Sequence, residues 1–397
     1  MKKTKRIVMM IALCFPLLLI QCNKDENKVI EEGTLTEQET PEISALINFL
    51  SENLGLNSKK IIYDLNTSTF IIDGDVLMPL EEARGHFNNI KTKITNKTNQ
   101  RFNGLPVSKE NSELIKVYIA PEVTSQWKVA IIEAISNWNT INSSINISLV
   151  DVVTPTSINV TALNQGKKSG VVATASYPTH DRQPGKSIII NTYYNGKTAS
   201  EKVSVMTHEF GHCFGLYHTD DDGGRLIPCT PISEMSSIMF SKVREWEGFS
   251  VFDKIAISTL YPVELGAIKL YRFKRNGYYF YTIDPCEITN GKDGYVFDGD
   301  LGYLYSTQVS GTVPLYRSIN GSVEKGHKLS KSQMASSDVI LGYLYLEQYP
   351  GTTALYCYKN STQDIYTTDN SGPLLRLTYG FVLHKIAKNG KYDGIVF

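Results

Sequence analysis

The sequence predicts an α+β protein up to about residue 263 and an all-β part after it. Helix-like apolar stripes alternate with short strand-like runs between residues 43 and 263. One of the expected helices carries histidines at a fixed spacing. After Tyr261-Pro262 the chain becomes rich in Tyr and Gly, and three related segments follow one another. At 397 residues the chain is long enough for several domains.

The N-terminus resembles the export signal of a bacterial lipoprotein. Four basic residues in the first six positions precede an apolar run from Ile7 to Ile20. This run is too short to span a bilayer and is typical of a signal peptide. The run ends at Leu19-Ile-Gln-Cys22, which resembles a lipobox and implies that Cys22 is lipidated. A plain secretory signal with an incidental Cys is the alternative.

The expected location follows from this resemblance. Residues 1–21 are the predicted lipoprotein signal peptide, and the polar, acidic residues 22–42 are a predicted tether. Lipid on Cys22 would anchor the exported chain to the bacterial outer membrane. The charged residues 24–26 resemble a surface-export signal of Bacteroidetes lipoproteins. The chain has a net charge of zero and no basic cluster after the signal peptide, which argues against nucleic acid as a partner.

Residues 43–110 are expected to form a small α+β segment. Ile43, Leu46, Ile47 and Leu50 have helical spacing. Strand-like runs at residues 61–63 and 70–76 follow, and then a second helix from Pro79 to about Ile90.

Residues 111–264 are expected to form a twisted mixed sheet with helices. Strands are predicted at residues 116–120, 145–150, 158–162, 171–176 and 187–191. A helix between the first two strands carries Trp127, Ile131, Ala134, Ile135 and Trp138 on one face. A second helix begins at the capping box Thr198-Ala-Ser-Glu201. Its apolar stripe consists of Val203, Met206, Phe210 and Cys213.

The other face of this second helix carries a candidate metal site. His208, Glu209, His212, Gly215 and His218 spell H-E-x-x-H-x-x-G-x-x-H. The first two histidines project from the same helical face, so both imidazoles can bind one Zn²⁺. Gly215 can adopt a positive φ and turn the chain so that His218 becomes the third ligand. Three protein ligands leave one position open, the pattern of a catalytic zinc ion. Glu209 can act as general base without ligating the metal.

This long motif resembles the metzincin metallopeptidases, and Val205–Asp220 is most similar to the bacterial "dual-action HEIGH" metallopeptidases, with Phe210 where Ile is usual. The resemblance extends over roughly residues 60–263. It implies a metzincin-like catalytic domain, one catalytic Zn²⁺ and hydrolysis of protein or peptide substrates. Ser236-Ser-Ile-Met239-Phe240 resembles the Met-turn of that clan, which would place Met239 beneath the metal.

The resemblance also bears on the flanking strands and on residues 43–110. That segment precedes the catalytic domain as a prodomain would, and it lacks the cysteine that a thiol latch needs. Asp73 or Asp75 could latch the metal instead, although Gly-Asp pairs are more typical of turns. The strand at residues 171–176 is our candidate for the free sheet edge that pairs with extended substrate.

Four cysteines remain after Cys14 leaves with the signal peptide and Cys22 takes lipid. Exported chains meet oxidising conditions, and four cysteines permit two disulfides, for which Cys213–Cys229 and Cys286–Cys357 are the candidate pairs. Alternatively, Cys213 is a buried apolar residue of the helix stripe.

Residues 265–397 contain a threefold repeat. Leu270-Tyr-Arg272, Leu315-Tyr-Arg317 and Leu355-Tyr-Cys357 recur 45 and 40 residues apart. Repeats of this length, all strand and turn, suggest a β-trefoil-like domain. Gly311–Arg317 resembles a repeat at the ends of many secreted bacterial hydrolases, and Cys357 replaces its Arg in the third copy. Carbohydrate or glycoprotein is the expected partner of such a module.

The sequence thus predicts a surface-anchored zinc endopeptidase that cleaves extracellular proteins. A non-catalytic adhesin that binds through residues 265–397 is the alternative from another class, and a zinc amidase acting on cell-wall peptides is a third. The carboxylate of Glu209 argues against the adhesin, because a scaffold without activity does not need a general base.

Overall fold

The computed structural model describes residues 40–89, 101–102, 106–220, 223–227, 229–231, 233–263, 266–288, 294–319, 327–359, 363–371 and 377–383. The predicted signal peptide, Cys22 and most of the predicted tether lie outside these residues. Within the described ranges, no helix has the length and apolar character needed to cross a membrane.

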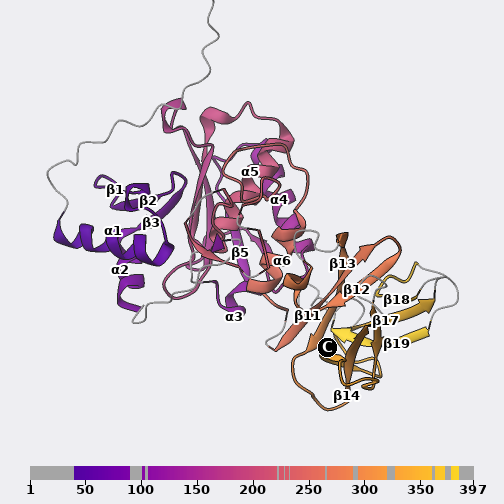
Figure 1. Cartoon of the computed structure of the whole chain (residues 1–397). Helices are drawn as coiled ribbons and strands as arrows, with labels where there is room; N and C mark the ends of the chain where they lie inside the picture. Colours follow the sequence, from indigo (N-terminus) through magenta and orange to yellow (C-terminus); the bar gives the residue numbers. More distant parts are fainter. Residues whose placement is uncertain are drawn as a thin grey trace, which may run out of the picture.

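An eight-stranded mixed sheet forms the centre of the molecule (Figure 1), and its strand order is β1-β2-β3-β8-β9-β7-β5-β6. The strands are β1 (Ile61–Asp64), β2 (Thr69–Ile72), β3 (Val76–Pro79), β5 (Ile115–Ile119), β6 (Ile147–Val150), β7 (Ser157–Leu163), β8 (Ala173–Ser176) and β9 (Ser187–Asn191). The helices around it are α1 (Pro41–Leu54), α2 (Leu80–Asn89), α3 (Lys109–Ser112), α4 (Ser125–Thr140), α5 (Ala199–Cys213) and α6 (Val251–Leu260). Short elements complete this part: η1 (Ser58–Lys60), β4 (Arg101–Phe102), η2 (Lys167–Ser169), η3 (Thr192–Tyr194) and β10 (Arg225–Leu226), of which β4 pairs with β10.

The main core lies between this sheet and the helices α4 and α5. The predicted stripe of α4 is buried, with Trp127 and Trp138 at 0% exposure. The predicted stripe of α5 packs into the same cluster, and Met206, Phe210 and Cys213 are also 0% exposed. Residues that are far from α5 in sequence therefore hold this helix in place. Helix α5 carries the histidine motif.

The N-terminal segment, residues 40–89, joins the central sheet. Strand β3 pairs in parallel with β8, with Val76 opposite Ala175. The apolar faces of α1 and the β1–β3 strands form a second core, to which Tyr177 and Tyr217 of the following region contribute. Strand β8 is therefore an interior strand, and our prediction that it is a free edge was wrong, because β3 occupies that edge.

The C-terminal part is an antiparallel all-β assembly of three related units. Its strands are β11 (Ala267–Arg275), β12 (Tyr278–Thr282), β13 (Val296–Tyr305), β14 (Thr312–Ile319), β15 (His327–Ser330), β16 (Val339–Tyr345), β17 (Thr352–Lys359), β18 (Asp364–Thr367) and β19 (Leu377–Leu383), and η4 (Pro285–Glu287) follows β12. Hairpins β11–β12, β14–β15 and β17–β18 recur, and each pairs with the third strand of its unit. The third strands β13, β16 and β19 pair with one another, which joins the units around a common centre.

The repeated leucines build the core of this part. Leu270, Leu315 and Leu355, one from each unit, are all 0% exposed in one cluster. The arginines that follow them in two units link the units. Arg317 Nη1 donates to the carbonyl of Tyr281 at 3.0 Å, and Arg272 Nη1 donates to that of Tyr366 at 2.9 Å.

The third unit has Cys357 in place of this arginine, and two tyrosine hydroxyls donate to the equivalent carbonyl instead. The carbonyl of Leu329 is the third acceptor, and the hydroxyls of Tyr366 and Tyr379 donate to it at 2.9 and 3.0 Å. The divergence of the third copy is therefore compensated locally.

The C-terminal part and helix α6 share apolar cores. Ile255 of α6 packs with Phe273 and Phe280, and Val263 packs with Tyr303 and Leu383. A buried polar contact reinforces this interface, because the ammonium of Lys269 donates to Ser258 and to the carbonyl of Asn142.

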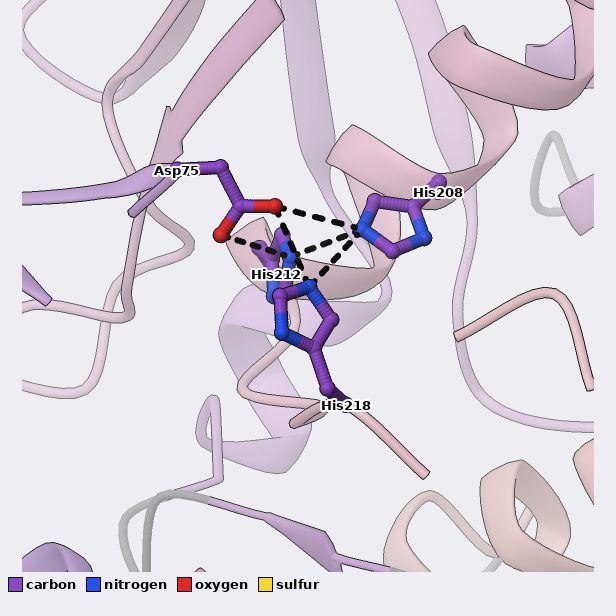
Figure 2. Close-up of side chains that lie close together, drawn as sticks. All are labelled: Asp75, His208, His212 and His218. Atoms are coloured by element: carbon purple, nitrogen blue, oxygen red, sulfur yellow. Dashed lines mark hydrogen bonds and ion pairs between the residues drawn. The ribbon is translucent and has the colours of Figure 1, made fainter. Parts of the chain in front are cut away.

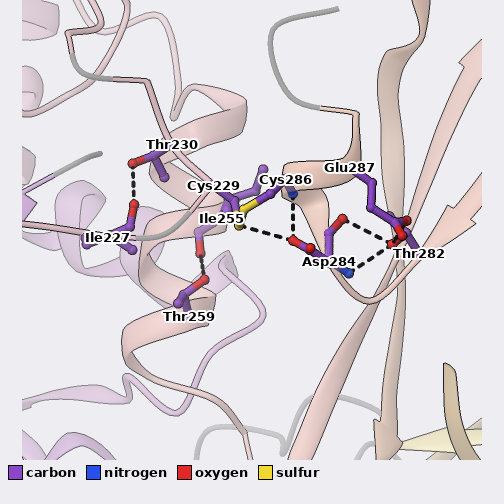
Figure 3. The surroundings of a disulfide bond; sticks show 9 residues. All are labelled: Ile227, Cys229, Thr230, Ile255, Thr259, Thr282, Asp284, Cys286 and Glu287. Carbon is purple, nitrogen blue, oxygen red and sulfur yellow. Dashed lines mark hydrogen bonds between the residues drawn. A yellow bond between two sulfur atoms is a disulfide. The ribbon is translucent and has the colours of Figure 1, made fainter. Parts of the chain in front are cut away.

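A disulfide between Cys229 and Cys286 crosses the same interface (Figure 3) and joins residues 57 positions apart. Both disulfides that we expected are therefore wrong. Cys213 is a free, buried thiol of the α5 stripe, as in the alternative above, and Cys357 is also free. The expected pairs do not form because the fold places these cysteines apart. Cys213 points into the main core, whereas Cys229 lies in the loop that faces η4.

Candidate active site

Helix α5 positions the first two histidines. Its N-terminus has the predicted capping box, in which Thr198 and Glu201 each accept from the other's backbone N–H. The helix ends at Cys213, and Gly215 turns the chain with φ of 88°. This turn brings His218 back toward His208 and His212, as the motif predicts.

The three imidazoles converge through their Nε2 atoms (Figure 2). His208 Nε2 lies 3.0 Å from His212 Nε2 and 3.2 Å from His218 Nε2. Each Nδ1 has an acceptor outside this centre. The acceptors are the carbonyl of Ile238 at 2.8 Å for His208, the carbonyl of Leu216 at 2.9 Å for His212 and the carboxylate of Asp73 at 2.8 Å for His218. These bonds keep the proton on Nδ1 and leave three lone pairs directed at one point.

This arrangement fits a zinc ion. Zn–N bonds of about 2.0–2.1 Å at tetrahedral angles separate two ligand nitrogens by about 3.3 Å, close to the separations found here. Three unprotonated nitrogens this close together would otherwise repel one another. Two buried carboxylate oxygens at the site, Asp75 Oδ1 and Glu209 Oε2, also have no hydrogen-bond partner in the described chain. A metal ion bound by the histidines would satisfy the Asp75 oxygen.

The segment after β10 packs against helix α5 and contacts His208. Met239 is buried, and its sulfur lies against Gly211 of α5, where a Cβ would come within 2.3 Å of it. The side chain of Asp253 in α6 accepts from Ser237 Oγ at 2.6 Å and from the N–H of Ile238 at 3.0 Å. Asp253 thus fixes the carbonyl of Ile238 that orients His208, a role that sequence reasoning missed.

Glu209 is buried next to the histidines, with 4% of its surface exposed. Burial, and then the nearby Asp75 carboxylate, raise the pKa of Glu209 well above its usual range. A carboxylate with a raised pKa is a good acceptor for a proton that it later returns.

Asp75 occupies the fourth corner of the cluster (Figure 2). Its carboxylate lies 3.1 Å from His218 Nε2 and 3.8 Å from the Nε2 atoms of both other histidines. Burial opposes its ionisation, but His218 and the other two histidines hold its pKa well below the usual range. Burial lowers the pKa of His218, but Asp75 and Asp73 outweigh this effect and raise the pKa to about 10, so a zinc ion would displace the proton of His218 Nε2 when it binds. In this conformation Asp75 stands where a catalytic zinc ion keeps its open position.

The chain around Asp75 is held in place by the sheet. Asp73 and Gly74 have positive φ angles of 52° and 95° and form the turn between β2 and β3. The N–H of Ala175 in β8 donates to the carbonyl of Asp75 at 3.1 Å. The local prediction of a Gly-Asp turn is therefore confirmed, and the same turn also delivers a carboxylate to the histidines.

A cavity of about 100 Å³ opens beside His208 and Glu209. Its apolar walls come from Val171–Ala173, from Val205 of α5 and from Ile238 and Phe240 of the Met239 turn, and about half of its lining is polar. Asp75 also lines it, and Lys242 stands among its lining residues as an exposed cation. A pocket beside the metal site can accept a substrate side chain.

Comparison with family models agrees with this site. Residues 70–261 match the family described as "Dual-action HEIGH metallo-peptidase", and residues 245–340 match a domain of unknown function, DUF5648. The first match contains all three histidines, Glu209, Met239 and the turn with Asp73 and Asp75. A search among curated proteins found no match.

Solved structures similar to the chain include two of myroilysin and one of a zinc-protease. Two structures of myroilysin are 17 and 15% identical to this chain, cover 38 and 42% of it and are themselves covered over 81 and 100%, with TM-scores of 0.29 and 0.28. High choriolytic enzyme 1, a hatching enzyme zinc-protease of the medaka Oryzias latipes, is 14% identical, covers 42% of this chain and is covered over 98%, with a TM-score of 0.29. These values are too low to transfer any property from those proteins.

The identification rests on the family match and on the converging histidines. The match covers the whole metal site, and the site has the donor set and spacing that a catalytic zinc ion requires. Residues 70–261 match the dual-action HEIGH metallo-peptidase family, and the chain is a zinc metallopeptidase.

Proposed function

We propose that this enzyme is a metzincin-type endopeptidase that cleaves internal bonds of extracellular proteins. The observation that carries the proposal is the convergence of His208, His212 and His218 with Glu209 beside them. The cavity beside His208 and Glu209 supports a protein substrate, because it can accept a side chain next to the metal site.

The roles of the residues follow from their positions. The histidines would hold Zn²⁺, which supplies a Lewis acid that activates water near neutral pH and polarises the scissile carbonyl. Glu209 would accept the proton of the attacking water and pass it to the leaving nitrogen. The side chain of Asp75 must leave the fourth corner before a substrate can be cleaved.

Glu209→Gln tests this mechanism. The variant keeps the size and burial of the side chain, so zinc content should stay at the wild-type level. Turnover of an unstructured protein such as casein should fall by about 10³-fold or more. His212→Ala is the matched control for the metal, because it should lose zinc itself. Near-normal proteolysis by Glu209→Gln would exclude the proposed mechanism.

We also propose that the enzyme is exported and anchored through a lipid on Cys22. The sequence before Cys22 supports this, and so does the Cys229–Cys286 disulfide, since such bonds persist in oxidising compartments. Cys22→Ser should move the enzyme from the membrane fraction to the soluble fraction without loss of peptidase activity. Equal distribution of both proteins would contradict the anchor.

For the C-terminal part we propose a β-trefoil-like relationship and a role in binding carbohydrate or glycoprotein. The threefold pairing of β13, β16 and β19 supports the first point. The second point rests on the repeat alone. Binding of the full chain to an array of bacterial and host glycans tests this role, and absence of binding to every glycan would contradict it.

A further inference from the structure

The outer nitrogens of the three histidines have different kinds of partners. His208 and His212 donate to main-chain carbonyls that lie within 30 and 4 residues of them in sequence. His218 donates to the carboxylate of Asp73, which is 145 residues away. Among the three bonds this is the only one to a charged acceptor.

A carboxylate behind a metal-binding histidine has two effects. It fixes the ring orientation and the tautomer, and it makes the opposite nitrogen a stronger donor to the metal. His218 needs this support most, because it follows the Gly215 turn and lies beyond the end of α5. No helical backbone holds its ring in place.

Asp73 is itself held firmly. Its side chain is 12% exposed, and the ammonium of Lys60 lies 3.3 Å from the Oδ1 atom. Its backbone N–H donates to the carbonyl of Lys60 at 2.9 Å. It also has the positive φ of 52° that starts the turn between β2 and β3. The carboxylate therefore reaches His218 from a rigid, sheet-anchored turn.

We propose that Asp73 is a positioning residue of the metal centre, so that the β2–β3 hairpin is a working part of the enzyme. The inference rests on the proposed function, since it assigns Asp73 to the same zinc site. The proposal assigns different roles to two carboxylates that are two positions apart in sequence. Asp73 strengthens the hold on zinc through His218, whereas Asp75 covers the open position. Removal of the hairpin would clear Asp75 from the site but would also weaken zinc binding.

Zinc affinity tests this proposal without relying on catalysis. The apo-enzyme is titrated with zinc against a chromophoric chelator, for the wild type, Asp73→Gly and Asp73→Asn. Both substitutions tolerate the positive φ, so the turn is kept. We expect the dissociation constant for zinc to rise about 10–100-fold in Asp73→Gly. Asp73→Asn should lie between this variant and the wild type, because its amide oxygen still accepts from His218 Nδ1.

Asp64→Asn is the matched control. It removes the same charge from the same segment, but Asp64 contacts Asn66 and Thr67, away from the metal. Its zinc affinity should stay within about 2-fold of wild type. The absorption spectrum of the Co²⁺-loaded enzyme should change in Asp73→Gly and not in Asp64→Asn, since only the former alters the ligand field of His218.

Two results would overturn the proposal. One is an Asp73→Gly variant that binds zinc as tightly as wild type. The other is an equal loss in Asp64→Asn, which would trace the effect to the general fold of the segment. If Asp73→Gly fails to fold, Asp73→Asn decides, and unchanged affinity in it would overturn the proposal. If the wild type and Asp75→Ala both bind zinc but cleave no peptide, the proposed function is refuted and this test stays intact.

Discussion

The N-terminal and C-terminal segments pack against the same catalytic region in different ways. Residues 40–89 enter the central sheet through β3 and place two carboxylates at the histidines. The C-terminal part packs on α6 and the Cys229–Cys286 bond, and Figure 1 shows it on the opposite side of the catalytic region. Substitutions in the N-terminal segment should therefore alter chemistry, whereas those in the C-terminal part should alter stability.

The largest effect on stability is expected at the disulfide. Replacement of Cys229 and Cys286 by serine should lower the free energy of unfolding by roughly 2–4 kcal/mol, because the unfolded chain gains conformational freedom. Zinc affinity and kcat should change less than about 2-fold, since neither cysteine approaches the histidines. Thermal unfolding and zinc titration of the oxidised wild type and the variant measure both quantities. A large loss of zinc affinity would contradict the claim that the C-terminal part affects stability and not the metal site.

A substitution of Asp75 should change the activity of the enzyme, in contrast to removal of the disulfide. Asp75→Ala removes the carboxylate from the fourth corner, so kcat/KM on a short peptide should rise at least about 10-fold, which corresponds to about 1.4 kcal/mol. Zinc content should stay near one ion, because the three histidines remain. A loss of activity with intact zinc would instead make Asp75 a necessary part of the working site.

Local sequence rules predicted the parts of the site that depend on one helix and one turn. The capping box at Thr198, the shared face of His208 and His212 and the turn at Gly215 each follow from residues a few positions apart. The roles of Asp73 and Asp253 could not be predicted in this way. Each depends on where its element packs in the folded chain, and a Gly-Asp pair or a helix-capping Asp looks the same when it contacts no metal site.

The same limit explains the wrong predictions at the sheet edge and at the cysteines. The strand at residues 171–176 has the composition of an edge or an interior strand, and only the pairing with β3 makes it interior. Four cysteines admit three pairings, and the choice depends on which loops face each other. By contrast, the repeat in the C-terminal part predicted its threefold strand pairing, because self-similar segments must pack alike.

A smaller, pH-dependent effect is expected at His86 in α2. It is buried, and its Nε2 atom lacks a hydrogen-bond partner in the described chain. Burial lowers the pKa of His86 below its ordinary value of 6.5, although Glu82 opposes the shift. The unfolded chain therefore binds more protons than the folded chain just below pH 6.5, and stability falls as the pH falls through this range.

His86→Gln removes this titration. The difference in unfolding free energy between wild type and variant should shift by about 1 kcal/mol between pH 7 and pH 5, with the wild type losing more. His327 is the control from the C-terminal part, since burial and then Arg317 lower its pKa to about 4. His327→Gln should show a similar shift in stability but no change in zinc release on acidification. If acidification releases the same amount of zinc from His86→Gln as from His327→Gln, the N-terminal segment stays on the metal site at low pH.

The smallest effect is expected when the repeat is made regular. Cys357→Arg restores the residue found in the other two units, yet the carbonyl that it would reach is that of Leu329, which already accepts from Tyr366 and Tyr379. The new guanidinium would have to displace one hydroxyl, so the hydrogen bond gained offsets the one lost. We expect the unfolding free energy to change by less than about 1 kcal/mol. Tyr379→Phe removes one of these two donors, and Cys357→Arg should stabilise the Tyr379→Phe background more than it stabilises the wild type. Equal effects in both backgrounds would show that the two tyrosines do not replace the missing arginine.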